Sequence, residues 1–84
     1  MSGVSERELA ARLIDAMTAA ADAEASAATA LVSITIDMLA QAAKAGVTPR
    51  LVRRTRTLIF MSAEARGDDG GLIATASSVH KIQS

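Results

Sequence analysis

The sequence predicts an all-α protein in which a long N-terminal helix, a tight glycine turn and a second helix form a helical hairpin, followed by a weak C-terminal segment. Nineteen of the 84 residues are alanine, the strongest helix former, and fifteen of these lie in residues 10–45. No glycine or proline interrupts residues 5–45. Residues that commonly begin helices precede both predicted helices. We therefore expect a helical hairpin that associates into a dimeric bundle.

The first helix has a well-marked start. Ser5 is followed three residues later by Glu8, which is the spacing of a capping box. The helix then continues either as one element of nearly forty residues to Ala45 or as two helices broken near residues 26–29. The β-branched residues between positions 32 and 36 lower helix propensity slightly without ending a helix. Because no loop-forming residues interrupt the stretch, the sequence favours one long helix.

A heptad pattern along this helix predicts self-association. A chain of 84 residues without cysteine has no disulfide to support a small core, and a partner chain is the remaining common support. Small and apolar residues recur at heptad spacing, which is the pattern of a packed helical seam. The predicted homodimer seam consists of Leu13, Met17, Leu31, Ile34 and Met38.

The second helix is predicted from Pro49 to Arg66. Gly46 suits the position just after a helix, and Thr48-Pro49 suits the start of the next one. Residues 67–71 contain three glycines and two aspartates and predict a linker. Residues 72–82 are expected to form a short, weak helix or a flexible tail, with His80 on the surface. The predicted organisation is a helical hairpin domain over residues 1–66, followed by a linker and tail over residues 67–84.

The predicted turn resembles the helix-turn-helix of repressors and MerR-type regulators. Ala42 lies four residues before Gly46, apolar Val47 follows the glycine, Thr48 could cap a recognition helix, and Val52 lies six residues after the glycine. The resemblance covers about fifteen residues, and it implies that residues 41–56 contact double-stranded DNA. Two positions of the pattern that are usually apolar hold a glutamine and a threonine, at residues 41 and 55.

Four arginines are concentrated within seven residues of the second predicted helix. Residues 1–45 carry a net charge of −3, whereas residues 46–66 carry +4. Such a cluster has three interpretations: a solvated helix face, a docking surface for an acidic protein, or a set of contacts to phosphate groups. The predicted partner or DNA contacts are Arg50, Arg53, Arg54 and Arg56.

The composition gives little support for an enzyme. The chain has no cysteine, tyrosine or tryptophan and one histidine, so we predict no catalytic, cofactor-binding or metal site. The predicted function is that of a non-enzymatic regulatory protein, of the adaptor, antiactivator or inhibitor type, which binds another protein. The alternative is a DNA-binding transcription regulator. No secretory signal or membrane-spanning run is present, which predicts a cytoplasmic protein that does not contact a membrane.

Overall fold

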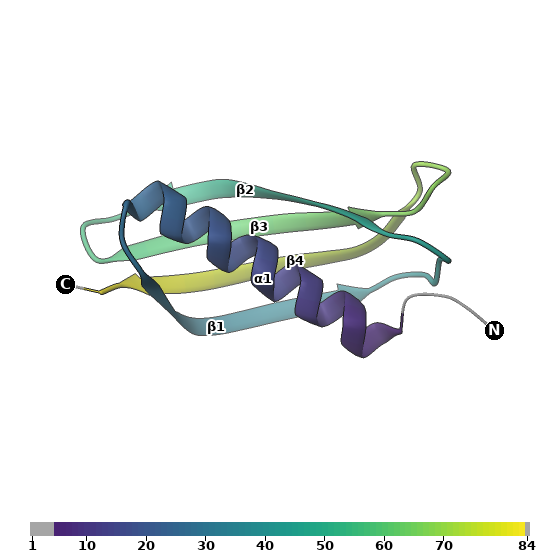
Figure 1. Ribbon diagram of the computed structural model, residues 1–84, viewed down its shortest axis with the longest axis horizontal. Helices are drawn as coiled ribbons and strands as arrows, with labels where there is room; N and C mark the ends of the chain where they lie inside the picture. Colours follow the sequence, from purple (N-terminus) through teal and green to yellow (C-terminus); the bar gives the residue numbers. More distant parts are fainter. Residues whose placement is uncertain (1–4, 84) are drawn as a thin grey trace.

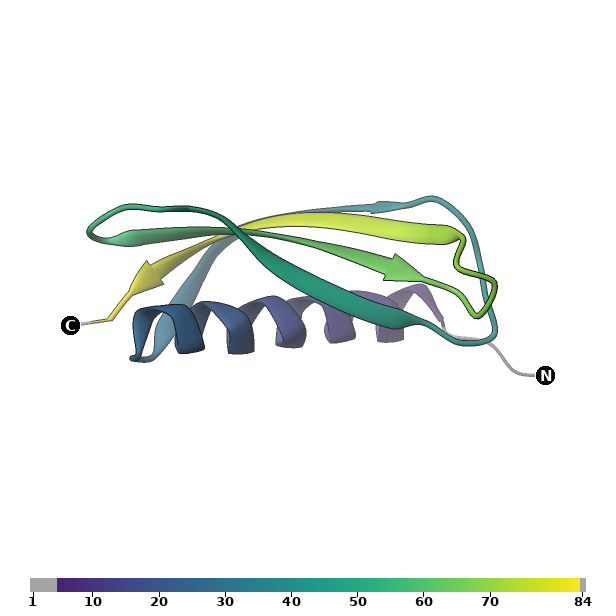
Figure 2. The same cartoon turned by 90° about the horizontal axis from the view of Figure 1, so that it is seen from above.

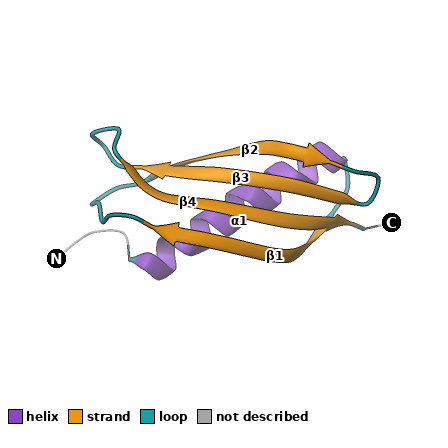
Figure 3. Cartoon of the chain, turned by 180° about the vertical axis from the view of Figure 1, so that it is seen from behind, coloured by secondary structure: helices purple, strands orange, loops and turns teal. Residues whose placement is uncertain are grey.

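The computed structural model describes residues 5–83, which form one helix packed on a four-stranded antiparallel sheet. The elements in chain order are α1 (Glu6–Ala25), β1 (Thr29–Met38), β2 (Gly46–Arg54), β3 (Leu58–Arg66) and β4 (Leu72–Ile82). The strands lie in the order β1-β4-β3-β2, so β1 and β2 are the edge strands (Figures 1 and 3). Figure 2 shows that the helix covers only one face of the sheet. The prediction of an all-α helical hairpin is therefore wrong.

The start of the helix is confirmed, but its end is not. The Ser5 hydroxyl accepts a hydrogen bond of 3.0 Å from the backbone N–H of Glu8, as an N-cap should. The helix ends at Ala25, twenty residues before the predicted end, because Ser26 adopts a left-handed conformation with φ 54°. Its backbone N–H bonds to the carbonyl of Ala23, which closes the last turn.

The remainder of the predicted long helix contains strand β1. Val32, Ile34, Thr35 and Ile36 favour a strand, and their preference prevails once the helix has ended at Ser26. Side chains of β1 alternate between the two faces of the sheet, which leaves Ile34 and Ile36 half-buried on the side of the helix.

The predicted second helix is a β-hairpin made of β2 and β3. Thr48 and Pro49, which were expected to start a helix, lie inside edge strand β2. The hairpin turns at residues 55–57, where the Thr55 hydroxyl accepts a hydrogen bond of 3.0 Å from the Leu58 N–H. The helix-turn-helix resemblance is also overturned, because its residues lie in the β1–β2 connection and in β2. The predicted weak C-terminal helix is strand β4, which pairs with both β1 and β3.

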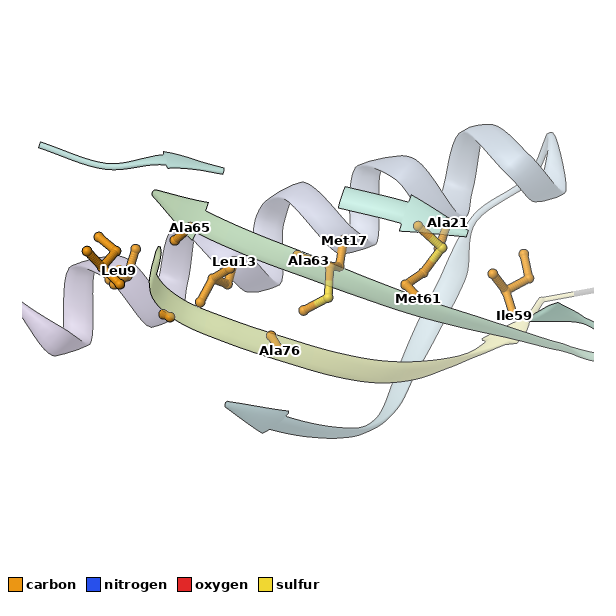
Figure 4. Packing of buried hydrophobic residues seen from close by; sticks show 11 residues of the cluster. Leu9, Leu13, Met17, Ala21, Ile59, Met61, Ala63, Ala65 and Ala76 are labelled. Atoms are coloured by element: carbon orange, nitrogen blue, oxygen red, sulfur yellow. The ribbon is translucent and has the colours of Figure 1, made fainter. Parts of the chain in front are cut away.

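The core lies between one line of helix residues and small residues of the central strands (Figure 4). The helix residues repeat every four positions, so they lie on one face. Opposite them, β3 and β4 present mainly alanine, which lets the helix approach the sheet closely. The buried helix residues are Leu9, Leu13, Met17 and Ala21, and the alanines facing them are Ala63, Ala65, Ala74 and Ala76. No helix within residues 5–83 is long and apolar enough to span a membrane.

Replacing Leu13 with alanine should destabilise the protein by about 2–5 kcal/mol, because its fully buried side chain would leave a cavity between helix and sheet. Leu39→Ala is the matched control, since the Leu39 side chain is 56% exposed and its loss should change stability by less than about 1 kcal/mol. Urea unfolding followed by circular dichroism measures both. Equal effects of the two substitutions would contradict the packing described.

Candidate functional site

A buried polar cluster joins the helix to β4. His80 is fully buried, contrary to its predicted surface position, and its Nε2 lies 2.7 Å from the Ser78 hydroxyl. That hydroxyl lies 3.4 Å from Sδ of Met17. One tautomer satisfies both contacts: Nε2–H donates to Ser78, and Ser78 donates to Met17. Nδ1 then keeps a lone pair, and no donor reaches it within residues 5–83.

This serine–histidine contact is structural rather than catalytic. The distance would suit a nucleophile and its base, but Ser78 and His80 are 3% and 0% exposed, so a substrate has no access to the pair. Among the described residues, no carboxylate forms a hydrogen bond with the second ring nitrogen. Burial lowers the pKa of His80 below its ordinary value, and the negative charge of Asp22 partly opposes that effect. His80 therefore stays neutral at pH 7.

Asp22 connects the end of the helix to the start of β1. Its Oδ1 accepts hydrogen bonds from the Thr29 N–H at 2.8 Å and from the Thr29 hydroxyl at 2.6 Å. These two hydrogen bonds hold the pKa of Asp22 below its usual range. The carboxylate thus stays ionised and fixes the connection between α1 and β1.

The helix carries one accessible carboxylate in its middle that the described chain does not engage. Glu8 pairs with Arg12 at 2.8 Å, Asp22 binds Thr29, and Glu24 lies 3.8 Å from Arg54. Asp15 has neither an ion pair nor a hydrogen bond among the described residues. It is exposed because Leu13 and Met17, two positions to either side, point into the core. The residues one turn away on the same face, at positions 11 and 19, are exposed alanines.

The four arginines of the predicted contact cluster do not share one face. Arg54 points to the helix side of the sheet, where it donates a hydrogen bond of 2.6 Å to the backbone carbonyl of Glu24. Arg50 and Arg53 lie opposite Ser62 and Phe60 and therefore face the other side. Arg56 lies in the β2–β3 turn. Whether these arginines contact a partner stays a prediction.

The predicted seam residues are divided between the helix and β1. Leu13 and Met17 are fully buried against the chain's own sheet. Leu31 is 41% exposed on β1, while Ile34 and Met38 are half-buried on the same strand. The residues accordingly form no continuous helical seam. The homodimer stays a prediction. Of the predicted seam residues, those on β1 are the ones that a second copy could still contact.

The described surface contains hollows at one end of the sheet and on its outer face. One of ≈ 390 Å³ lies between the loop residues 40–44 and 67–71, at the end of the sheet near the helix N-terminus. The second, of ≈ 260 Å³, lies on the sheet face away from the helix, where Phe60, Val79 and Val52 contribute to its lining. Within residues 5–83, no group of three or more histidine, aspartate or glutamate side chains is placed to hold a metal ion.

Comparison with known proteins identifies the fold. No protein-family model matches the sequence, and no curated protein matches it. Solved structures do match. A suggested esterase from Mycobacterium tuberculosis superposes with a TM-score of 0.91 at 14% identity, over 99% of this chain and 71% of that one. A hypothetical thioesterase from Streptococcus pneumoniae, solved with coenzyme A, superposes with a TM-score of 0.88 at 11% sequence identity. The match covers 99% of this chain and 68% of that one. The chain therefore has the same fold as these two structures, which is the hotdog fold.

A third match has a higher sequence identity. A suggested thioesterase from Ralstonia eutropha JMP134, described as related to phenylacetic acid degradation, is 28% identical, with a TM-score of 0.78 over 96% of this chain and 64% of that one. In eight solved structures that it matches, the chain spans from 50% to 71% of their lengths. It therefore corresponds to only part of each of these proteins.

These neighbours overturn the predicted function. The expected helical regulator and the alternative DNA-binding regulator both require an all-α chain, whereas the fold is a helix on a sheet. Proteins with this fold and high structural similarity are described as thioesterases and esterases, and this finding contradicts the prediction that the chain is not an enzyme. Sequence reasoning missed Asp15 as a candidate because a single aspartate on an alanine-rich helix forms no motif.

The buried histidine predicts a loss of stability in mild acid. The pKa of histidine in an unfolded chain is about 6.5. Because the pKa of His80 is lower in the folded protein, the unfolded state binds the proton first, and the free energy of unfolding should fall as the pH drops from about 7 to 5. The Asp22 contribution is separate, since it is lost only below the ordinary aspartate pKa of 3.8.

Two measurements check this prediction. Urea unfolding at pH 7.5 and pH 5 gives the change in stability, and the NMR titration of the His80 ring reports its pKa directly. Asp22→Asn should lower that pKa further, because it removes the carboxylate that favours the charged ring. A ring that titrates at or above 6.5 in the folded wild type would show that the imidazole is not buried as described.

Proposed function

We propose that this chain is the part of a thioester hydrolase that carries the catalytic carboxylate, and that Asp15 is this carboxylate. The main support for this proposal is the position of Asp15 in the middle of the helix of a hotdog fold. It is exposed and forms no ion pair or hydrogen bond with the described residues. Its exposed alanine neighbours leave space for a substrate along the helix. The description of similar proteins as thioesterases supports the choice of reaction.

The proposed reaction needs a base and a stabiliser of negative charge. The Asp15 carboxylate takes a proton from a water molecule, and the water oxygen attacks the thioester carbonyl carbon. The carbonyl oxygen becomes an oxyanion in the tetrahedral intermediate. When the intermediate collapses, the carbon–sulfur bond breaks, the thiolate leaves and takes the proton from Asp15. The products are a carboxylic acid and a thiol.

The oxyanion requires hydrogen-bond donors that α1 cannot supply near Asp15. The free N–H groups of the helix are in its first turn, and Asp15 lies nine residues beyond Glu6, about 14 Å along the axis. The backbone N–H groups around Asp15 are used within the helix. We therefore propose that the site is completed by a second copy of the chain, in line with the homodimer expected from the sequence.

The two edge strands differ in a way that supports β1 as the pairing edge. Strand β2 contains Pro49 and three arginines, which are residues that discourage strand addition. Strand β1 has ten residues, no proline and no basic residue, with Asp37 as its one charge. Its Leu31 and Val32 are 41% and 59% exposed. Antiparallel pairing of two β1 strands would cover these side chains and continue the sheet across both copies.

We also propose that the protein works in the cytoplasm. The absence of cysteine fits a reducing compartment, where disulfides do not form. A hydrolase that depends on one carboxylate and on buried apolar contacts needs no oxidising environment.

Asp15→Asn should reduce kcat for thioester hydrolysis by about 100-fold or more, because an amide cannot accept the proton of the attacking water. The test measures release of free thiol from short-chain acyl-coenzyme A and from a neutral acyl-N-acetylcysteamine. Glu6→Gln is the matched control, since Glu6 is an exposed acid of the same helix, and its substitution should leave kcat unchanged. Full activity in the folded Asp15→Asn variant would refute the assignment of Asp15.

Leu31→Lys should weaken self-association at least tenfold. Each copy would then carry a positive charge on its β1 strand, and the two charges would repel each other along the paired strands. Leu51→Lys on β2 is the matched control, because Leu51 is also 41% exposed on an edge strand. Sedimentation velocity over a range of micromolar concentrations measures the dissociation constants. A monomeric wild type, or dissociation by Leu51→Lys alone, would contradict pairing through β1.

A further inference from the structure

The sheet face away from the helix, here called the outer face, carries four cations near one end. Arg50 and Arg53 point outward from β2, and Lys81 points outward from β4. Arg56 lies in the adjacent turn between β2 and β3. We call these four residues the basic patch. It extends about 13 Å along the strands, because the β3 partners of Arg50 and Lys81 are four residues apart.

The acidic side chains of the outer face lie toward the other end of the sheet. Asp37 and Glu64 both align with Thr75, which lies beyond the basic patch along the strands. The Glu64 carboxylate is paired with Arg66, whose guanidinium nitrogen lies 3.1 Å away. Within residues 5–83, the cations of the basic patch form no ion pair. The patch therefore carries positive charge that no carboxylate of the described chain neutralises.

Hydroxyl groups are frequent on the outer face, and each of the four strands contributes at least one. Serine is depleted in the buried centres of protein–protein interfaces, so this composition is poor for docking a protein. Arginine, lysine, serine and threonine side chains are the usual donors to phosphate and sugar oxygens of nucleic acids. The composition of the outer face therefore favours a nucleic acid as its ligand. The outward-facing hydroxyl residues of the strands are Ser33, Thr35, Thr48, Ser62, Thr75 and Ser77.

An aromatic ring lies among these hydroxyls and beside the basic patch. Phe60, the only aromatic residue of the chain, lines the hollow of ≈ 260 Å³ together with Val52 and Val79. It aligns with Arg53 on the neighbouring strand, so the ring and a guanidinium group share one row of the outer face. Unpaired bases stack on aromatic rings and on the planes of arginine side chains. The hollow thus has the composition that receives a base while the arginines contact its phosphates.

We propose that the outer face binds a single-stranded nucleic acid, with one base against Phe60 and the phosphates on the basic patch. A single strand is required, because the bases of a duplex are paired and stacked and cannot reach the ring. The cations are spread over about 13 Å and line neither hollow described above, which fits a chain of phosphates better than one small anion. The rejected helix-turn-helix prediction instead required a helix in the groove of a duplex.

This binding activity is separate from the proposed thioester hydrolysis. The outer face lies on the opposite side of the sheet from α1, and Asp15 points away from the sheet on that helix. A nucleic acid on the basic patch would therefore leave the proposed catalytic carboxylate uncovered. The inference does not rest on the proposed function.

Fluorescence anisotropy with labelled oligonucleotides of about twelve residues tests the contribution of the charges. The probes are oligouridylate RNA, oligothymidylate DNA and a DNA hairpin duplex, and the duplex should bind at least about tenfold more weakly than either single strand. Arg53→Glu with Arg56→Glu should raise the dissociation constant for the single strands at least about tenfold. It should also flatten the salt dependence of log K by about 1.4, because each phosphate contact of a single strand contributes about 0.7. Arg7→Glu with Lys44→Glu is the matched control, since it makes the same change in net charge at exposed residues outside the patch.

Substitutions of Phe60 test the stacking of a base. The chain contains no tryptophan or tyrosine, so Phe60→Trp introduces a single fluorophore, and a base stacked on it should quench its fluorescence. Phe60→Leu keeps an apolar side chain but removes the aromatic face, and it should raise the dissociation constant at least about fivefold. Phe60→Tyr should retain the affinity of wild type. Urea unfolding checks that each variant is folded, and the arginine pair decides the question if a Phe60 variant is not.

The outcomes separate nucleic-acid binding from the other uses of this face. Weaker binding by the patch variant alone, together with quenching of the tryptophan, supports the proposal. Support holds whether RNA and DNA bind equally or RNA binds more tightly, and an RNA preference would assign the hydroxyl groups to the ribose 2′-OH. Equal weakening in both double variants, equal affinity for the duplex, or no single-strand binding by wild type at low salt would overturn it. Polyglutamate that binds as tightly as the oligonucleotides would also overturn it and assign the patch to an acidic protein.

Discussion

The close contact between α1 and the central strands determines the rest of the structure. Large helix side chains such as Leu13 and Met17 pack against β3 and β4, whose alanines allow a close approach beside the first part of the helix, while Met61 and Ile59 lie toward its C-terminal end (Figure 4). This contact fixes the rotation of the helix about its axis. Asp15, which lies between the two buried residues in sequence, must then point away from the sheet. The exposure of the proposed catalytic carboxylate is thus a consequence of core packing.

The sequence predicts the start of the helix but not its end. The capping box at Ser5 depends on local hydrogen bonds, and local patterns determine such features. The end at Ala25 depends on the competition between alanine, which favours a helix, and the β-branched residues from Val32 to Ile36, which favour a strand. Alanine is misleading here, because in β3 and β4 it serves close packing rather than helix formation. The alternation of polar and small apolar residues from Ser62 to Arg66 was the available sequence signal for the strand that became β3.

The predicted contact residues illustrate a further limit of sequence reasoning. Neighbouring arginines on a helix would spread around its surface, whereas on a strand they alternate between two faces. Arg53 and Arg54 are adjacent in sequence, but Arg54 is engaged by Glu24 beside the helix and Arg53 faces the other side. The hairpin turn at residues 55–57 contains no glycine, proline or asparagine, so nothing in its composition marks it. Once the hairpin is missed, the arginines cannot be assigned to their faces.

The small apolar area buried within one copy links the fold to the proposed dimer. An interface built largely of alanine buries little apolar area per residue, so a single copy leaves Leu31 and Val32 exposed on β1. Pairing along that strand would bury these side chains. It would also bring a second chain close to α1, whose mid-helix N–H groups are unavailable to an oxyanion. Under the proposed pairing, one association would supply the missing apolar burial and place a second chain where it could offer the missing donors.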